Sequence, residues 1–362
     1  MMTSVKHLFC TICCCIALGS CSVIDDDLSV CDNHYELDYE LRLVTNMNTE
    51  LKTQLSTETQ LSLAHSLRTH LADIFTDFAH DVDLSFYDTQ GDSLRLQHDE
   101  HIMDANQASY ALNLPKRQYM HLAVANIVDN PLVDLVDDER CHTARLSRLH
   151  GGTVLRGDDA PIVDSHTTGI FTARQLMKVL EGIDQQFDVR LYMANCAAAL
   201  VIDTIDSNAK DIEVYSTGFA VGFNVADSSY LFVDNPPLIR AKRVEEAHDP
   251  GEVAFCSVSF PSREAPAPKS QQASRRVIIE TDEPFISTLA DESLWELHVY
   301  ATAMDGTRTK SILYIRRPLR AGQLMIIKVR MHDDGSVTSG DPTVGVSITL
   351  NWNDAGSHEV PL

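Results

Sequence analysis

Apolar and polar residues alternate with a period of two along most of the chain, which is typical of strands whose two faces meet different surroundings. The alternation is clear in residues 81–88, 119–126 and 325–331. It is most regular near the end of the chain, where five apolar residues share one parity: Val344, Val346, Ile348, Leu350 and Trp352. The sequence therefore predicts a mainly β protein.

Turn residues and helical spacing divide this pattern into elements. Residues 110–114 and 120–124 flank Pro115 and predict a hairpin, with the polar segment His98–His101 as a loop before it. Leu67, Leu71, Ile74 and Phe78 follow helical spacing, and so do Leu176, Val179 and Ile183, so each group predicts a short helix packed on a sheet.

The length of 362 residues favours two domains. Strand character resumes after the second predicted helix, at residues 187–201. We therefore place the domain boundary near residue 185, just before this run. The pattern predicts one β-sandwich over residues 31–184 and another over residues 185–362.

The first 20 residues have the layout of a secretory signal, with Lys6 ahead of an apolar run from Leu8 to Leu18. Residues Leu18-Gly19-Ser20-Cys21 resemble the bacterial lipobox, which implies cleavage before Cys21 and lipidation of its sulfur. The alternative is an ordinary signal peptide with a chance cysteine. Residues 21–30, which include Asp25-Asp26-Asp27, predict an acidic tether similar to the surface-export signals of some Bacteroidetes lipoproteins.

The net charge and the positions of the cysteines limit the kinds of partner and of covalent bonding that we expect. The chain has 29 Lys and Arg against 52 Asp and Glu, a formal charge of −23, which argues against a nucleic-acid partner. Outside the first 21 residues the cysteines are Cys31, Cys141, Cys196 and Cys256. Their wide spacing favours buried free thiols, and the disulfide alternative stays open.

The sequence contains no strong catalytic or metal-binding motif. His98-Asp99-Glu100-His101 has its histidines three residues apart, whereas a helical zinc motif needs four. His150-Gly151-Gly152 resembles an esterase oxyanion loop, but the sequence contains no Gly-x-Ser-x-Gly elbow to accompany it. Phosphate-binding glycine motifs are also missing from the sequence. We therefore expect no catalytic residue, no cofactor and no metal, and a protein that binds or holds.

Several segments taken in order resemble the FimB/Mfa2 family of Bacteroidetes fimbrial anchor subunits. They are the lipobox, Cys31, and the strand patterns at Tyr35–Tyr39, Asp81–Asp88, Tyr119–Asn126 and Val344–Asn353. The resemblance implies two tandem transthyretin-like, Greek-key β-sandwiches and no enzyme activity. It also implies a lipid anchor in the outer membrane, exposure at the cell surface, and contact with a fimbrial stalk subunit.

In this class of pilus, a strand of one subunit fills a groove of its neighbour, so the apolar face from Val344 to Trp352 is a candidate for subunit binding. The alternative is that this strand completes the core of its own domain. A second functional hypothesis is a surface adhesin that binds host protein or glycan without a pilus. An exposed aromatic platform would favour that hypothesis, but Trp295 and Trp352 lie in strand patterns and are expected in the core.

Overall fold

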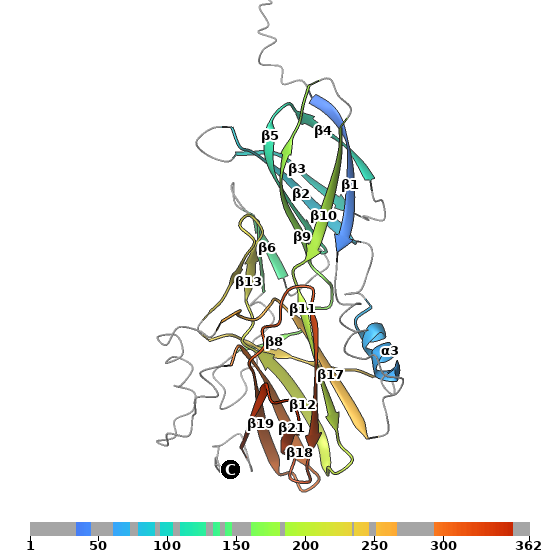
Figure 1. The fold of residues 1–362 in the computed structure, drawn as a ribbon, viewed down its shortest axis with the longest axis vertical. Helices are drawn as coiled ribbons and strands as arrows, with labels where there is room; N and C mark the ends of the chain where they lie inside the picture. Colours follow the sequence, from blue (N-terminus) through green and yellow to red (C-terminus); the bar gives the residue numbers. More distant parts are fainter. Residues whose placement is uncertain are drawn as a thin grey trace, which may run out of the picture.

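The structure is a computed structural model, and it places two groups of strands one above the other along the long axis of the molecule (Figure 1). Strands dominate, with sheets packed in pairs and helix α3 (Leu61–His70) beside the lower group. The prediction of a mainly β fold is confirmed. The residues described are 34–44, 61–72, 79–90, 95–103, 109–127, 133–137, 142–146, 161–181, 185–233, 235–245, 251–265 and 293–349.

The upper group is a seven-stranded sheet that bends into two layers. Its order is β3-β2-β5-β9-β10-β1-β4, and β9 and β10 share only two residue pairs, so the sheet folds over at that corner. We call this unit the first sandwich. Its strands are β1 (His34–Val44), β2 (Asp81–Asp88), β3 (Arg95–Met103), β4 (Ser109–Pro115), β5 (Gln118–Ala125), β9 (Phe171–Lys178) and β10 (Gln185–Met193).

Alternating side chains from both layers fill the core of the first sandwich. Leu37 and Tyr39 on β1 face Leu84 and Phe86 on β2, and all four are fully buried. The rings of Tyr39 and Phe86 meet edge to face with centroids 6.5 Å apart, a favourable arrangement for aromatic pairs. The period-two pattern in the sequence is therefore the pattern of this core.

The predicted helix at Leu176–Ile183 is wrong, because residues 171–178 form strand β9. Phe171, Ala173 and Met177 share one parity and point into the core, while Leu176 is 60% exposed. Leu176 and Val179 suggested a helical stripe only because an exposed leucine was counted as a core position.

Two predicted connections between the early strands are also wrong. β4 and β5 do not form a hairpin, since β4 pairs with β1 and β5 pairs with β2 and β9 in the other layer. The chain crosses between the layers at Lys116–Arg117 instead of turning within one. The segment His98–His101, expected as a loop, lies within strand β3 and pairs with β2.

The lower group consists of a five-strand sheet packed against a six-strand sheet, and we call it the second sandwich. The orders are β16-β17-β11-β20-β21 and β22-β19-β18-β12-β15-β8. Trp295 is completely buried between them, as predicted, and its indole N–H donates to the Arg317 carbonyl at 2.9 Å. The strands are β8 (Ile162–Asp164), β11 (Cys196–Asp203), β12 (Ala209–Thr217), β15 (Leu238–Arg240), β16 (Lys242–Arg243), β17 (Glu252–Ser259), β18 (Trp295–Ala303), β19 (Arg308–Ile315), β20 (Leu324–Met331), β21 (Val337–Ser339) and β22 (Val344–Thr349).

The five-strand sheet is covered on both faces. Leu200 and Ile202 of β11 face the six-strand sheet, whereas the small side chains of Ala197 and Ala199 belong to the core cluster of helix α3. Leu63 and Leu67 of α3, and Leu71 directly after it, belong to that cluster, and each is at most 2% exposed. The predicted helix near residue 67 therefore exists, but it covers the second sandwich.

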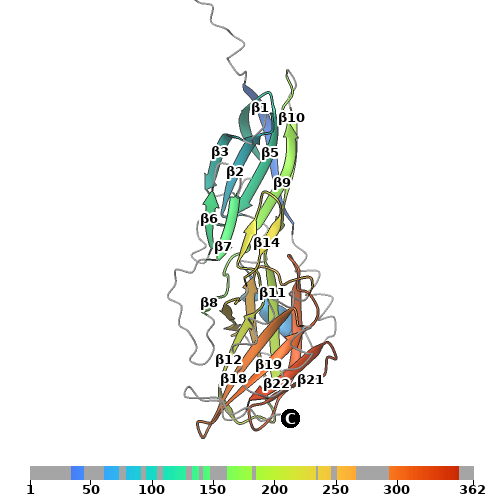
Figure 2. The ribbon, with the colours of Figure 1, turned by 90° about the vertical axis from the view of Figure 1, so that its left-hand side faces the viewer.

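Other segments from the first half of the chain also pair with strands from the second half. β8 pairs with β15 in the six-strand sheet. A separate four-strand sheet, β14-β13-β7-β6, pairs β7 with β13, and Figure 2 shows β14 beside the lower end of β9. The strands of this sheet are β6 (Val133–Asp137), β7 (His142–Leu146), β13 (Gly222–Asn224) and β14 (Ser229–Leu231).

The expected domain boundary at residues 184 and 185 falls between β9 and β10, which are neighbours in one sheet. β10 pairs with β1 over residues 185–192, so these residues belong to the first sandwich. We propose that the chain passes between the sandwiches at Ala194–Asn195. The division is not a simple cut, since α3 and β8 come from the first half of the chain and belong to the second sandwich.

Candidate functional site

The predicted subunit-binding strand forms the edge of the six-strand sheet. β22 pairs antiparallel with β19 from Val344 to Thr349, and its other side has no paired strand among the residues that the structure describes. Val344 is 7% exposed, and Val346 packs against the same core. Ile348 is half-buried. This strand contributes to the core of its own domain and also leaves one edge open.

Several residues singled out in the sequence lie outside the described ranges. They are Cys21, Cys31, Cys141, the segment His150–Gly152, and the last two members of the candidate strand, Leu350 and Trp352. The lipidation of Cys21 and the role of β22 in binding a subunit stay predictions.

Cys196 and Cys256 are free thiols buried in the five-strand sheet. Cys196 pairs with Ser259 and Cys256 with Ala199 in the ladder between β11 and β17. Burial raises the pKa of each thiol to about 12. The thiolate is the reactive form of cysteine, so these two residues serve packing and not catalysis.

A buried polar network lies where the chain passes between the two sandwiches. The Asn195 side chain accepts from the Ile170 N–H at 2.5 Å, and its amide donates to Nδ1 of His166 at 2.5 Å. The Gly322 N–H donates to the Asn195 carbonyl at 2.7 Å. Burial lowers the pKa of His166 to about 4, so its imidazole is neutral at ordinary pH. Asn195 thus joins three distant segments and fixes this junction.

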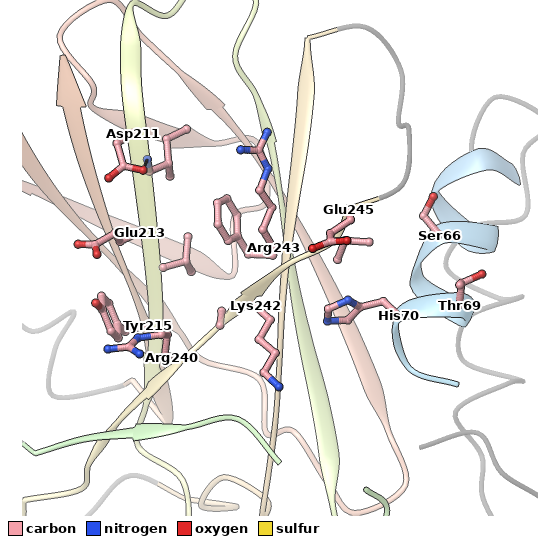
Figure 3. A pocket seen from close by; sticks show the side chains of 15 residues that line it. Ser66, Thr69, His70, Asp211, Glu213, Tyr215, Arg240, Lys242, Arg243 and Glu245 are labelled. Carbon is pink, nitrogen blue, oxygen red and sulfur yellow. Dashed lines mark hydrogen bonds between the residues drawn. The ribbon is translucent and has the colours of Figure 1, made fainter. Parts of the chain in front are cut away.

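A groove of about 650 Å³ runs between α3 and strands β12, β15 and β16 (Figure 3). His70 points from the helix toward Lys242 and Glu245. Burial lowers the pKa of His70, Lys242 lowers it further, and Glu245 opposes the shift. The other charged residues of the lining balance by sign, with Asp211 and Glu213 against Arg240 and Arg243. The groove therefore has no strong preference for a ligand of either charge.

A second groove, of about 540 Å³, lies between the β9–β10 corner and the β13–β14 hairpin. Its rim has two exposed arginines, Arg174 and Arg190, and Tyr192, whose side chain is 56% exposed. None of these residues was among the candidates predicted from the sequence. The available signal was the outward parity of Asp188, Arg190 and Tyr192 on β10, which places two charges and an aromatic ring on one face.

The described residues lack two further features. They contain no cluster of three or more His, Cys, Asp and Glu side chains that could hold a metal ion. Within the same residues, no helix has both the length and the apolar character needed to span a membrane.

Solved structures similar to this chain include bacterial adhesion and fimbrial proteins. No protein-family model matches the sequence, and no curated protein matches it. The chain is similar to the fimbrial anchor protein Mfa2 from Porphyromonas gingivalis, with 10% identity and a TM-score of 0.42 over 88% of this chain and 98% of that one.

Two Bacteroides structures give similar values. A proposed polysaccharide-binding protein from Bacteroides thetaiotaomicron is 10% identical, with a TM-score of 0.47 over 90% of this chain and 98% of that one. A proposed adhesin from Bacteroides ovatus is 11% identical, with a TM-score of 0.46 over 79% and 84%. One of these neighbours, the anchor protein Mfa2, bears the name of the family that the sequence resembles. At these identities and TM-scores they assign neither a partner nor an activity to this chain.

Proposed function

We propose that this chain is a non-enzymatic outer-membrane lipoprotein that anchors or assembles a fimbrium at the cell surface. Its lipidated Cys21 holds the membrane, and an edge strand of its sandwiches holds the first fimbrial subunit. The observation that carries the proposal is the lipobox at residues 18–21, followed by strand patterns in the order of the fimbrial anchor family.

The physical chemistry of both contacts supports this role. Each buried methylene of a lipid chain contributes about 0.8 kcal/mol, so two or more acyl chains on one cysteine give a stable anchor. An open sheet edge offers backbone hydrogen bonds to an added strand, while alternate side chains provide specificity. β22 has such an edge, and it lies near the end of the sequence.

Deletion of the gene in its native host, followed by electron microscopy of the cells, tests the proposal. We expect fimbriae of altered length, or fimbriae shed into the medium. Complementation with Cys21→Ser should leave the protein in the soluble fraction and the fimbriae detached. Cys31→Ser is the matched control and should remain in the membrane fraction. Firmly attached fimbriae of normal length in the deletion strain would refute the anchor role.

A photo-crosslinker at Ser347 tests the strand contact separately. Ser347 is exposed on β22, and Met304, which is 76% exposed in the turn between β18 and β19, is the matched control position. We expect a crosslink from residue 347 to the fimbrial stalk subunit, detected by immunoblot, and none from residue 304. Equal crosslinking from both positions, or from neither, would exclude β22 as the contact.

The second candidate function is a surface adhesin that binds host protein or glycan without a pilus. One observation favours it: Tyr192 presents an exposed aromatic ring at the rim of the 540 Å³ groove. An aromatic ring of this kind was the feature expected to support an adhesin.

A further inference from the structure

We propose that the groove between the β9–β10 corner and the β13–β14 hairpin binds an acidic carbohydrate. Arg174 and Arg190 hold the carboxylate, and Tyr192 stacks on a sugar ring. The inference rests on the second candidate function and not on the fimbrial one, so either can fail alone.

The register of β9 and β10 sets the two arginines opposite one another, at the point where the strands separate. The last paired residues are Thr172 with Tyr192 and Phe171 with Met193. Arg174 and Arg190 each lie two residues beyond the Thr172–Tyr192 pair, on the same outward face, and both line the groove. Continuing the register places the two guanidinium groups on opposite sides of the gap between the strands, where one anion can contact both.

Among the residues that the structure describes, neither arginine has a carboxylate partner, which is unusual in so acidic a chain. Neither Arg174 nor Arg190 has an ion pair or a hydrogen bond to another described residue, although acids outnumber bases by 52 to 29. Other arginines of the described chain do have such partners, among them Arg117 with Asp88 at 2.6 Å. Guanidinium groups bind carboxylates in bidentate geometry, so a pair of free arginines at one rim favours an anionic ligand.

The opposite wall of the groove is aromatic and held in place. The rings of Phe223 and Tyr230 pack with centroids 4.6 Å apart. The Tyr230 hydroxyl donates to the Ala194 carbonyl at 3.0 Å, and burial raises the pKa of that hydroxyl well above its usual range. Together with Tyr192, these rings give the groove flat apolar surfaces of the kind that the C–H faces of a sugar cover.

The remaining polar groups of the groove favour an acidic sugar over a ligand with many negative charges. Gln175, Asp188 and Ser228 also line the groove and offer acceptors and donors for hydroxyl groups. The Asp188 carboxylate and the net charge of −23 disfavour a polyphosphate or a nucleic acid. The volume of about 540 Å³ lies within the range of small-molecule sites.

Isothermal titration calorimetry on the purified full chain tests the inference. The probes are a panel of acidic oligosaccharides: galacturonate trisaccharide, glucuronate trisaccharide and sialyllactose. A galactose trisaccharide is the neutral control, and inorganic phosphate is the free-anion control. We expect at least one acidic probe to bind about tenfold or more tightly than either control, since hydrogen bonds to charged groups contribute about 1.5–3 kcal/mol.

Variants then locate the binding site. Arg190→Gln and Tyr192→Ala should each weaken binding of that probe about tenfold. Arg42→Gln is the matched control: Arg42 is paired with Arg190 in the β1–β10 ladder, but it already has Glu40 as a partner at 2.9 Å. This variant should bind within about twofold of wild type. All three substitutions are at exposed positions, so unchanged melting temperatures confirm folding.

Three results would overturn the inference. If the neutral trisaccharide binds as tightly as the acidic probes, the arginine pair does not recognise the ligand. If phosphate binds as tightly, the sugar ring does not contribute to binding. Failure of the whole acidic panel excludes the ligand class. None of these results bears on fimbrial attachment, which is measured in cells by microscopy.

Discussion

Helix α3 supports a sandwich to which its neighbours in sequence do not belong, and Leu67→Ala measures that support. Leu67 is fully buried in the cluster that α3 shares with the five-strand sheet. Leucine-to-alanine changes in cores cost about 2–5 kcal/mol, and the cost is higher where neighbours cannot fill the cavity. The β11 residues of the same cluster include Ala197 and Ala199, whose short side chains cannot extend to fill it. We therefore expect a loss of about 3–4 kcal/mol in the free energy of unfolding.

Urea denaturation followed by circular dichroism measures this loss, and native-state hydrogen exchange locates it. Amide protection in β11 and β17 should fall, while protection in β1 and β4 should change less. Arg68→Ala is the matched control, since Arg68 is exposed on the same helix and its change should stay within about 0.5 kcal/mol. A Leu67→Ala effect no larger than the control, or protection lost only in β1 and β4, would refute the docking of α3 on the second sandwich.

Three further predictions concern buried polar groups. Tyr39→Phe should destabilise the chain by about 1–3 kcal/mol in urea denaturation, because it leaves the buried Nε2 of His121 without its hydrogen-bond partner, whereas Tyr192→Phe should have little effect. The pKa of His166 is about 4 when folded and about 6.5 when unfolded, so stability should fall by about 3 kcal/mol as pH drops from 6.5 to 4. A His166→Gln variant that kept this part of the pH dependence would contradict the assignment. Cys196 and Cys256 should react with a thiol reagent only at the rate of unfolding, and rapid labelling in native buffer would contradict their burial.

The strands of the fold could be predicted because their information is local. Val82, Leu84 and Phe86 of β2 occupy alternate positions in the core of the first sandwich, and Val344 and Val346 of β22 do so in the second. The failure at residues 171–178 has an equally local cause: the exposed apolar side chain of Leu176 imitated a helical stripe. Period alone cannot separate a helix from a strand when an apolar residue faces solvent.

The docking of α3 on the five-strand sheet could be predicted only in part from the sequence. The run Cys196–Asp203 is apolar at both parities, which indicates a strand covered on both faces. Nothing in that run specifies that the second cover is a helix from residues 61–70. Such partners are set by contacts between distant segments, which no local pattern records.

The second groove illustrates the same limit at a candidate site. Arg174 and Arg190 are 16 positions apart and belong to different strands. They lie at one groove because the register of β9 and β10 sets them opposite one another, beyond the two residue pairs that these strands form. Either arginine alone is a residue type that can bind an anion, but only the folded sheet places both at one groove.

The parallel pairing of β1 with β10 determines how the molecule would resist being pulled. Tension entering at the start of β1 and leaving through the end of β10 acts along the two strands in opposite directions (Figure 1). Eight residue pairs, from Leu37–Gln185 to Val44–Tyr192, are then sheared together and cannot open one at a time like a zipper. This geometry gives the first sandwich mechanical strength without any additional contact, and the proposed tethering of a filament would require such strength.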